Sequence, residues 1–245
     1  MPGTPRGRRD IFDDFEMDNV AASTADGVRW LSTIDTGGTG AVGPAFGTDT
    51  YKITLDTTDN DMGEIAHALL AWRVQDGELG MEVRFQVDVI TDLALSFGFN
   101  DDALEDSNTL PVELSTTTFT TNSSTWVGVL FDVDATNDDF HAFWVDDDSD
   151  STTAIANLRF TTPALVAARW FTVRIVLTDQ GSGNQVRAEL SIIDEETGSM
   201  SQKTFASTVD RDALLTPHVA LENRATAAHV LDIDYIHVWS NRVQE

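Results

Sequence analysis

The fold is decided by a segment close to the carboxyl end, residues 229–239, which reads HVLDIDYIHVW. Apolar side chains occupy alternate positions of this segment: Leu231, Ile233, Tyr235 and Trp239. A period of two predicts a strand with one face on a core and with Asp232 and Asp234 on the other face. The second face also becomes apolar at Ile236 and Val238, which favours a central strand that is covered on both sides.

Other segments repeat this alternation. Residues 79–89 predict a long half-buried strand, and residues 93–99 continue the pattern after a turn, so we expect them to form its antiparallel neighbour. Residues 64–73 fit either a buried strand or a helix of about two turns. Two more hairpins are predicted, residues 126–133 with 140–145 and residues 171–177 with 186–192.

Two segments interrupt the strand pattern. Residues 36–47 are rich in glycine, but they contain no lysine and no amphipathic helix follows. Neither the P-loop pattern nor the dinucleotide-binding pattern is met, so a flexible connection is expected. Residues 100–125 are rich in Thr, Ser and Asp and predict a long excursion at one end of the fold, which is where such scaffolds place recognition.

About a dozen strands with regular turns, and almost no helical periodicity, predict an all-β fold: a two-sheet antiparallel sandwich of jelly-roll type. The chain has 245 residues, of which 41% are hydrophobic. That length suits one large core, so we expect a basic N-terminal arm at residues 1–9 and a single sandwich domain at residues 10–245. Because there is no cysteine, packing must stabilise the fold.

The chain is strongly acidic, with a formal charge of −26. A field of this sign repels nucleic acid and anionic membranes, so neither is expected as a partner. A GC-rich genome or a saline habitat explains such a surface. An acidic face that recognises a basic partner or cations is the alternative.

No segment predicts export or membrane insertion. The basic first residues are followed by no apolar run, so no secretory signal peptide is expected. No segment approaches the ~20 apolar residues that a membrane span needs. We therefore expect a soluble protein.

Clustered aspartates suggest two kinds of chemistry. Paired carboxylates can hydrolyse glycosidic bonds, and the spacing of Asp132 with Asp134, or of Asp232 with Asp234, fits one strand face. Neither pair has the extra glutamate of a complete catalytic set, so no enzyme is expected. Calcium prefers carboxylate oxygens, and Asp132, Asp134 and Asp138 are the candidate ligands. The alternative is that these aspartates lie in solvated acidic loops and that the protein binds no cofactor.

Histidine and tryptophan carry weaker signals. The five histidines are scattered and predict no zinc site. The six tryptophans sit mostly in or beside predicted strands, which favours core packing over an aromatic platform for sugars.

The basic arm contains Arg6, Arg8 and Arg9. A cationic arm can become ordered on an acidic partner surface, which makes these residues the candidate partner-binding set. A frayed terminus is the alternative.

Residues 231–239 resemble the final strand of concanavalin A-like lectin and glucanase domains, and Asp13-Asp14-Phe15 is similar to the start of such domains. The resemblance implies their jelly-roll fold. In the glucanase branch the catalytic strand carries Glu-x-Asp-x-x-Glu, which this sequence lacks.

Residues 127–136, 174–177 and 186–190, together with the closing strand, resemble virion proteins of tailed phages and viruses. This resemblance implies a non-catalytic capsid decoration or turret protein on the virion surface, made in the host cytoplasm. Its partners would be the major capsid protein or other virion proteins, and it would form a homo-oligomer. The alternative is a carbohydrate-binding module that recognises host glycans through loops; a glycan hydrolase is the third hypothesis.

Overall fold

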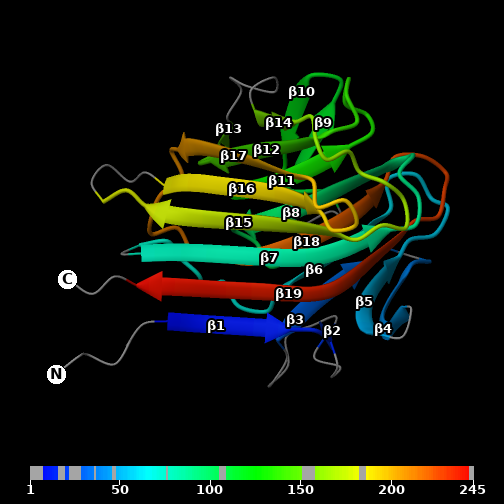
Figure 1. Cartoon of the computed structure of the whole chain (residues 1–245), viewed down its shortest axis with the longest axis horizontal. Helices are drawn as coiled ribbons and strands as arrows, with labels where there is room; N and C mark the ends of the chain where they lie inside the picture. Colours follow the sequence, from blue (N-terminus) through cyan, green and yellow to red (C-terminus); the bar gives the residue numbers. More distant parts are fainter. Residues whose placement is uncertain are drawn as a thin grey trace.

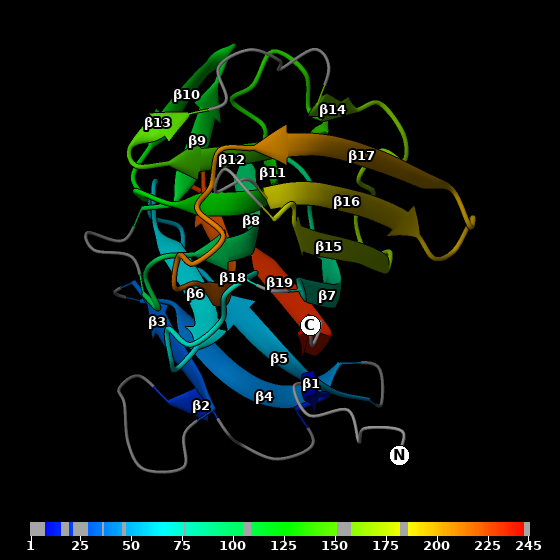
Figure 2. The same ribbon diagram turned by 90° about the vertical axis from the view of Figure 1, so that its left-hand side faces the viewer.

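The computed structural model describes residues 8–15, 20–21, 29–35, 37–45, 48–75, 77–104, 109–150, 158–181 and 186–242. Two large, mainly antiparallel sheets face each other across one core (Figures 1 and 2). The predicted all-β sandwich is therefore confirmed. Within the described ranges, no helix is long and apolar enough to span a membrane.

Sheet A is the layer nearest the viewer in Figure 1. Its order is β17 (Met200–Ser207), β16 (Val186–Asp194), β15 (Phe171–Asp179), β7 (Gly77–Val87), β19 (Val230–Arg242), β5 (Thr48–Thr54) and β4 (Thr39–Ala45). The strand β1 (Arg8–Asp13) pairs with the second half of β19. The two ends of the described chain therefore lie side by side.

Sheet B forms the opposite layer. Its order is β13 (Ser149–Asp150), β12 (Phe140–Asp146), β11 (Trp126–Asp132), β8 (Leu93–Asn100), β18 (Thr216–Asn223), β6 (Met62–His67), β3 (Trp30–Ile34) and β2 (Val20–Ala21). The short strand β14 (Arg159–Phe160) pairs with β12. Strands β2 and β3 run parallel.

A β-bulge in β19 decides which of its side chains face the core. The pairing of β19 with β7 shifts between Ile233 and Tyr235. Ile233 is buried in the core before the shift, and Ile236 and Val238 are buried there after it. An inserted residue moves the following side chains to the other face. The prediction that Tyr235 and Trp239 belong to the core row is therefore wrong, because both lie on the outer face.

Two strands that were expected to be neighbours belong to different sheets. Strand β7 pairs with β15 and β19, whereas β8 pairs with β11 and β18. Their side chains meet across the core instead, with the ring centroids of Phe85 and Phe97 4.4 Å apart. Alternation shows which face of a strand is buried but not which strand lies beside it.

The other predicted hairpins are confirmed, because β11 pairs with β12 and β15 pairs with β16. Residues 62–67 form strand β6, which settles the choice between strand and helix there. The predicted flexible connection is wrong for residues 39–45, which form β4 and pair with β5. As an edge strand, β4 needs hydrogen bonds on one side only, so glycine and proline are tolerated.

Residues 109–125 cover the outer face of sheet B instead of extending from its end. They include the hairpin of β9 (Val112–Ser115) and β10 (Thr118–Thr121) (Figure 2). Apolar side chains of this hairpin form a second cluster with outward-facing side chains of β11 and β12: Val112, Leu114, Phe119, Trp126, Leu130, Phe143 and Val145. We call residues 109–125 the covering segment.

Tryptophan serves two roles. Trp30, Trp72 and Trp126 are buried, as core packing predicts. Trp170 and Trp239 instead lie under the guanidinium groups of Arg84 and Arg174 on the outer side of sheet A. The outer face of this sheet therefore carries aromatic side chains that are not part of the hydrophobic core.

Candidate functional site

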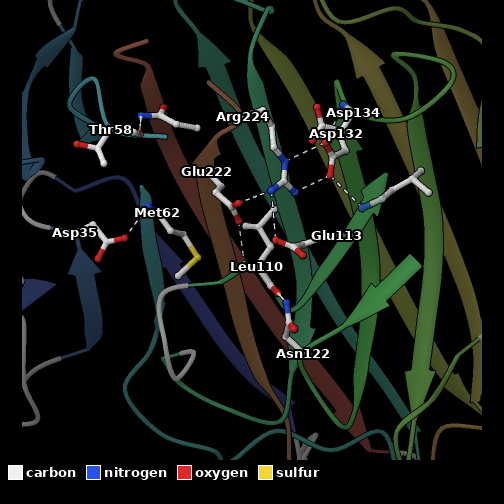
Figure 3. Close-up of polar contacts among 12 residues, drawn as sticks. Asp35, Thr58, Met62, Leu110, Glu113, Asn122, Asp132, Asp134, Glu222 and Arg224 are labelled. Carbon is white, nitrogen blue, oxygen red and sulfur yellow. Dashed lines mark hydrogen bonds and ion pairs between the residues drawn. The ribbon is translucent and has the colours of Figure 1, made fainter. Parts of the chain in front are cut away.

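Under the covering segment, one arginine holds three carboxylates (Figure 3). Arg224 directly follows β18, and its Nε and Nη2 atoms donate to Asp132 Oδ1 and Oδ2 at 3.1 and 2.7 Å. Its Nη1 donates to Glu222 and, at 3.3 Å, to Glu113. The planar fork of a guanidinium matches a carboxylate with two parallel bonds, so Asp132 is its main partner. We call these four residues the Arg224 cluster.

The charge balance of the Arg224 cluster changes its ionisation. One cation faces three carboxylates, so full ionisation would leave negative charge in a buried place. Burial raises the pKa of Glu222 to about 8, with Glu113 and Asp132 adding to the effect and Arg224 opposing it. Glu222 is therefore the carboxyl group that takes a proton near neutral pH.

The Arg224 cluster fastens the covering segment to sheet B. Glu222 Oε2 accepts a hydrogen bond from the Leu110 N–H at 3.3 Å, and Asp132 Oδ2 accepts one from the Leu114 N–H at 3.0 Å. The Asn122 side chain donates to the Leu110 carbonyl at 2.8 Å. These contacts, and the burial of Asp132 and Glu222, give the cluster a structural role.

The predicted calcium ligands are not brought together. Both carboxylate oxygens of Asp132 are used by Arg224, so little charge remains for a cation. Asp134 and Asp138 are exposed, and partial burial and Asp132 raise the pKa of Asp134. In the part of the chain that the structure describes, no group of three or more His, Asp or Glu side chains could hold a metal ion.

The second aspartate pair is also held by cations. Asp232 Oδ1 lies 3.3 Å from Lys52 Nζ, and Asp234 Oδ2 accepts a hydrogen bond from Arg84 at 2.8 Å. Each member of the pair has its own cationic partner, as Asp132 does. The arrangement therefore neutralises these carboxylates instead of preparing them for a glycosidic bond.

The predicted basic arm is partly built into sheet A. Arg6 lies outside the described residues. Arg8 and Arg9 belong to β1, which therefore begins two residues before the predicted start of the domain. The Arg9 guanidinium lies 4.1 Å from the centroid of the Trp72 ring, and its Nη1 donates to the Ala71 carbonyl at 3.4 Å. Burial lowers the pKa of Arg9. A role of these arginines in binding a partner stays a prediction.

The outer face of sheet A carries an open pocket of about 260 Å³. Its lining residues come from β7, β15 and β19: Glu82, Arg174, His237, Trp239 and Asn241. The last three follow the bulge of β19 and lie opposite Glu82, Gly80 and Glu78 of β7. Without the inserted residue these side chains would point into the core. We call this site the sheet A pocket.

Trp239 forms the base of the sheet A pocket. Its indole packs on Gly80, where an added Cβ would lie 2.1 Å from the ring. Its Nε1 donates to Glu78 Oε1 at 2.8 Å, and the Arg174 guanidinium lies 5.3 Å from the ring centroid. Trp239 is only 7% exposed, so its ring packs under Arg174 and forms the bottom of the pocket but leaves no open face on which a ligand could stack.

Neighbouring side chains orient the polar rim of the pocket. Glu82 Oε1 accepts a hydrogen bond from the Tyr235 hydroxyl at 2.8 Å. Burial and this contact with Glu82 raise the pKa of Tyr235. His237 Nε2 lies 2.8 Å from Asp10 Oδ1. Arg174 is exposed and makes no ion pair with any residue that the structure describes, so its donors face solvent.

Apolar surface adjoins these polar groups. Phe12 of β1 is 53% exposed, and its ring centroid lies 5.8 Å from that of His237 and 5.3 Å from that of Tyr235. The site thus combines donors, a carboxylate acceptor and an aromatic wall. This combination suits a small polar ligand that has one apolar face.

Gly80 gives a direct test of how the pocket is built. Replacing Gly80 by valine is expected to lower the unfolding free energy by about 1–3 kcal/mol, because the new side chain overlaps Trp239. Thr178→Val, on the outer face of neighbouring β15, is the control and should change little. Urea unfolding measures both. Equal stabilities of the two variants would contradict the packing of Trp239 on Gly80.

Sequence reasoning missed the sheet A pocket and the Arg224 cluster. The change of apolar face at Ile236 and Val238 was the signal for the pocket, since a bulge explains it as well as two-sided burial does. Nothing local signals the cluster, because Arg224 and Asp132 are far apart in the sequence.

The comparisons with known proteins identify the fold. No family model and no curated protein matches the sequence. Among solved structures, peanut lectin matches with a TM-score of 0.60 and 13% identity, over 97% of this chain and 99% of that chain. The carbohydrate recognition domain of Emp47p matches with a TM-score of 0.55 and 14% identity, over 98% of this chain and 100% of that chain. The chain has the concanavalin A-like jelly-roll fold.

A third match is a protein of unknown function from Shewanella oneidensis MR-1, with a TM-score of 0.58 and 11% identity, over 98% of this chain and 90% of that chain. At such identities the likeness shows the concanavalin A-like fold alone. It agrees with the resemblance of the closing strand to lectin and glucanase domains. The three structures give no support to the resemblance to virion proteins.

Proposed function

We propose that the chain is a non-catalytic carbohydrate-binding protein and that the sheet A pocket is its glycan site. The observation that carries the proposal is the pocket itself, in which the Glu82 carboxylate lies beside Arg174, a cation without an ion pair among the described residues, and next to which the exposed Phe12 packs on His237. The concanavalin A-like fold, shared with a carbohydrate recognition domain, supports the ligand class.

The pocket offers what one sugar residue needs. Hydroxyl groups of a pyranose can donate to Glu82 and accept from Arg174, while the C–H face of the ring can lie against Phe12 and His237. The volume of about 260 Å³ is small, so the pocket holds one residue of a glycan and leaves the rest in solvent.

Arg174→Ala tests the proposal. A glycan array first finds the ligand, and isothermal titration calorimetry then measures its affinity. Loss of a charged hydrogen bond to the sugar is expected to weaken binding at least about tenfold. The matched control is Arg187→Ala, which removes an exposed arginine from neighbouring β16 and should keep the wild-type affinity. No binding on the array, or equal affinities of the two variants, would refute glycan binding at this pocket.

The role in a virion stays a prediction. It would place the chain on a capsid as a homo-oligomer, with the major capsid protein as its partner, and no observation of the structure favours it over glycan binding. Co-sedimentation with assembled particles tests it. Glycan hydrolysis has less support, because Asp132 is bound to Arg224, Asp232 to Lys52 and Asp234 to Arg84.

A further inference from the structure

A second polar site lies at one end of sheet B, where β6 and β18 meet the turn that leads from β5 to β6. Met62 and Glu222 are paired, Asp61 precedes Met62 and Asn223 follows Glu222, and the Asn223 N–H donates to the Asp61 carbonyl at 2.9 Å. Residues directly opposite in an antiparallel pair have Cβ atoms about 5 Å apart on one face. The side chains of Asp61 and Asn223 are therefore neighbours.

Each of these side chains has a buried oxygen without a hydrogen-bond partner, Oδ2 of Asp61 and Oδ1 of Asn223. The residues are 8% and 0% exposed. Asn223 Nδ2 donates to the carbonyls of Asp56 and Thr58 at 2.9 and 3.0 Å, which places the amide inside the turn and assigns Oδ1 as an acceptor. Two neighbouring buried acceptors require a donor or a positive charge between them.

Asp56 closes this site from the other side of the turn. Its carboxyl group is hydrogen-bonded to that of Asp61. Two carboxyl groups in contact repel each other when both are ionised, so a proton or a cation must lie between them. The contact between Asp56 and Asp61 and the two unpartnered oxygens thus indicate the same kind of occupant.

We propose that Asp56, Asp61 and Asn223 bind a calcium ion. Their oxygens are the hard ligands that calcium prefers, and an irregular turn with carbonyl groups suits its flexible coordination. The set contains two carboxylates and one amide. It therefore differs from the groups of three or more His, Asp or Glu side chains that are absent from the described residues. The site shares no residue with the sheet A pocket or with the candidate ligands Asp132, Asp134 and Asp138, so its failure would leave the proposed glycan binding untouched.

Calorimetric titration of the full chain with calcium chloride tests the proposal, in about 0.15 M NaCl to screen the acidic surface. Wild type is expected to bind one ion, and Asp61→Asn is expected to weaken binding at least about tenfold. The matched control, Asp59→Asn, changes an exposed aspartate of the same turn and should bind within about twofold of wild type.

Asp56→Asn and the thermal midpoint of wild type with and without a chelator provide a second readout. Asp56→Asn should lose affinity as Asp61→Asn does, and the chelator should lower the wild-type midpoint. An absence of saturable binding, which would leave ordered water as the occupant, overturns the proposal. So does an equal effect of Asp61→Asn and Asp59→Asn, which would indicate diffuse binding to the acidic surface.

Discussion

Replacing Arg224 by methionine is expected to lower the unfolding free energy by about 3–5 kcal/mol. The guanidinium is the cation that pairs with Asp132, Glu222 and Glu113 under the covering segment, and the first two carboxyl groups are 0% and 2% exposed. Methionine fills the space but leaves buried negative charge without a partner. Urea unfolding measures the loss.

Two variants sharpen this test. Arg187→Met removes an arginine that is 50% exposed and paired with Glu189, so it should cost no more than about 0.5 kcal/mol. Arg224→Lys keeps the charge but cannot form the two parallel bonds to Asp132, and its stability should fall between wild type and Arg224→Met. A loss below about 1 kcal/mol for Arg224→Met would mean that water reaches and solvates the cluster.

Glu222→Gln is expected to remove the contribution of Glu222 to the pH dependence of stability between about pH 5 and pH 8. The pKa of Glu222 rises from 4.5 to about 8 on folding, so the folded chain binds the proton more tightly. Its stabilising contribution is complete below pH 4.5 and is lost as the pH rises through 8. The wild-type unfolding free energy therefore decreases across this window, by at most about 1.4 kcal/mol per pH unit from this group.

Glutamine keeps the shape of Glu222 and does not titrate in this pH range. The difference in unfolding free energy between wild type and Glu222→Gln therefore isolates the contribution of the Glu222 carboxyl group. Chemical unfolding at a series of pH values measures that difference. Glu189→Gln, at a more exposed position on sheet A, should follow the wild-type curve. Parallel curves for wild type and Glu222→Gln would show that Glu222 stays ionised beside Arg224.

Local patterns predicted the strands well but not all of their neighbours. Residues 171–177 and 186–192 form a hairpin because both the alternation and the turn lie within one short segment. Residues 79–89 and 93–99 have the same alternation but cross between the sheets, since Phe85 and Phe97 meet face to face in the core. The burial pattern of a strand is identical in the two cases.

The polar sites depend on partners that are distant in sequence. Asp132 and Asp134 look like a metal-binding or catalytic pair when read locally, yet Asp132 binds an arginine 92 positions later. The glycine-rich residues 39–45 look like a loop because propensity ignores the neighbouring strand β5. In each case a contact that only the folded chain creates outweighs the local signal.

The irregularity in the last strand has a consequence for comparing this protein with relatives. A homologue that lacks one residue near Asp234 would keep Leu231 and Ile233 in place but would turn His237 and Trp239 inward and Ile236 and Val238 toward solvent. An ungapped alignment over this strand would thus equate positions on the outer face with interior ones. Conservation of the chain length between Ile233 and Trp239 is a more informative marker of a shared outer face than conservation of the aromatic residues themselves.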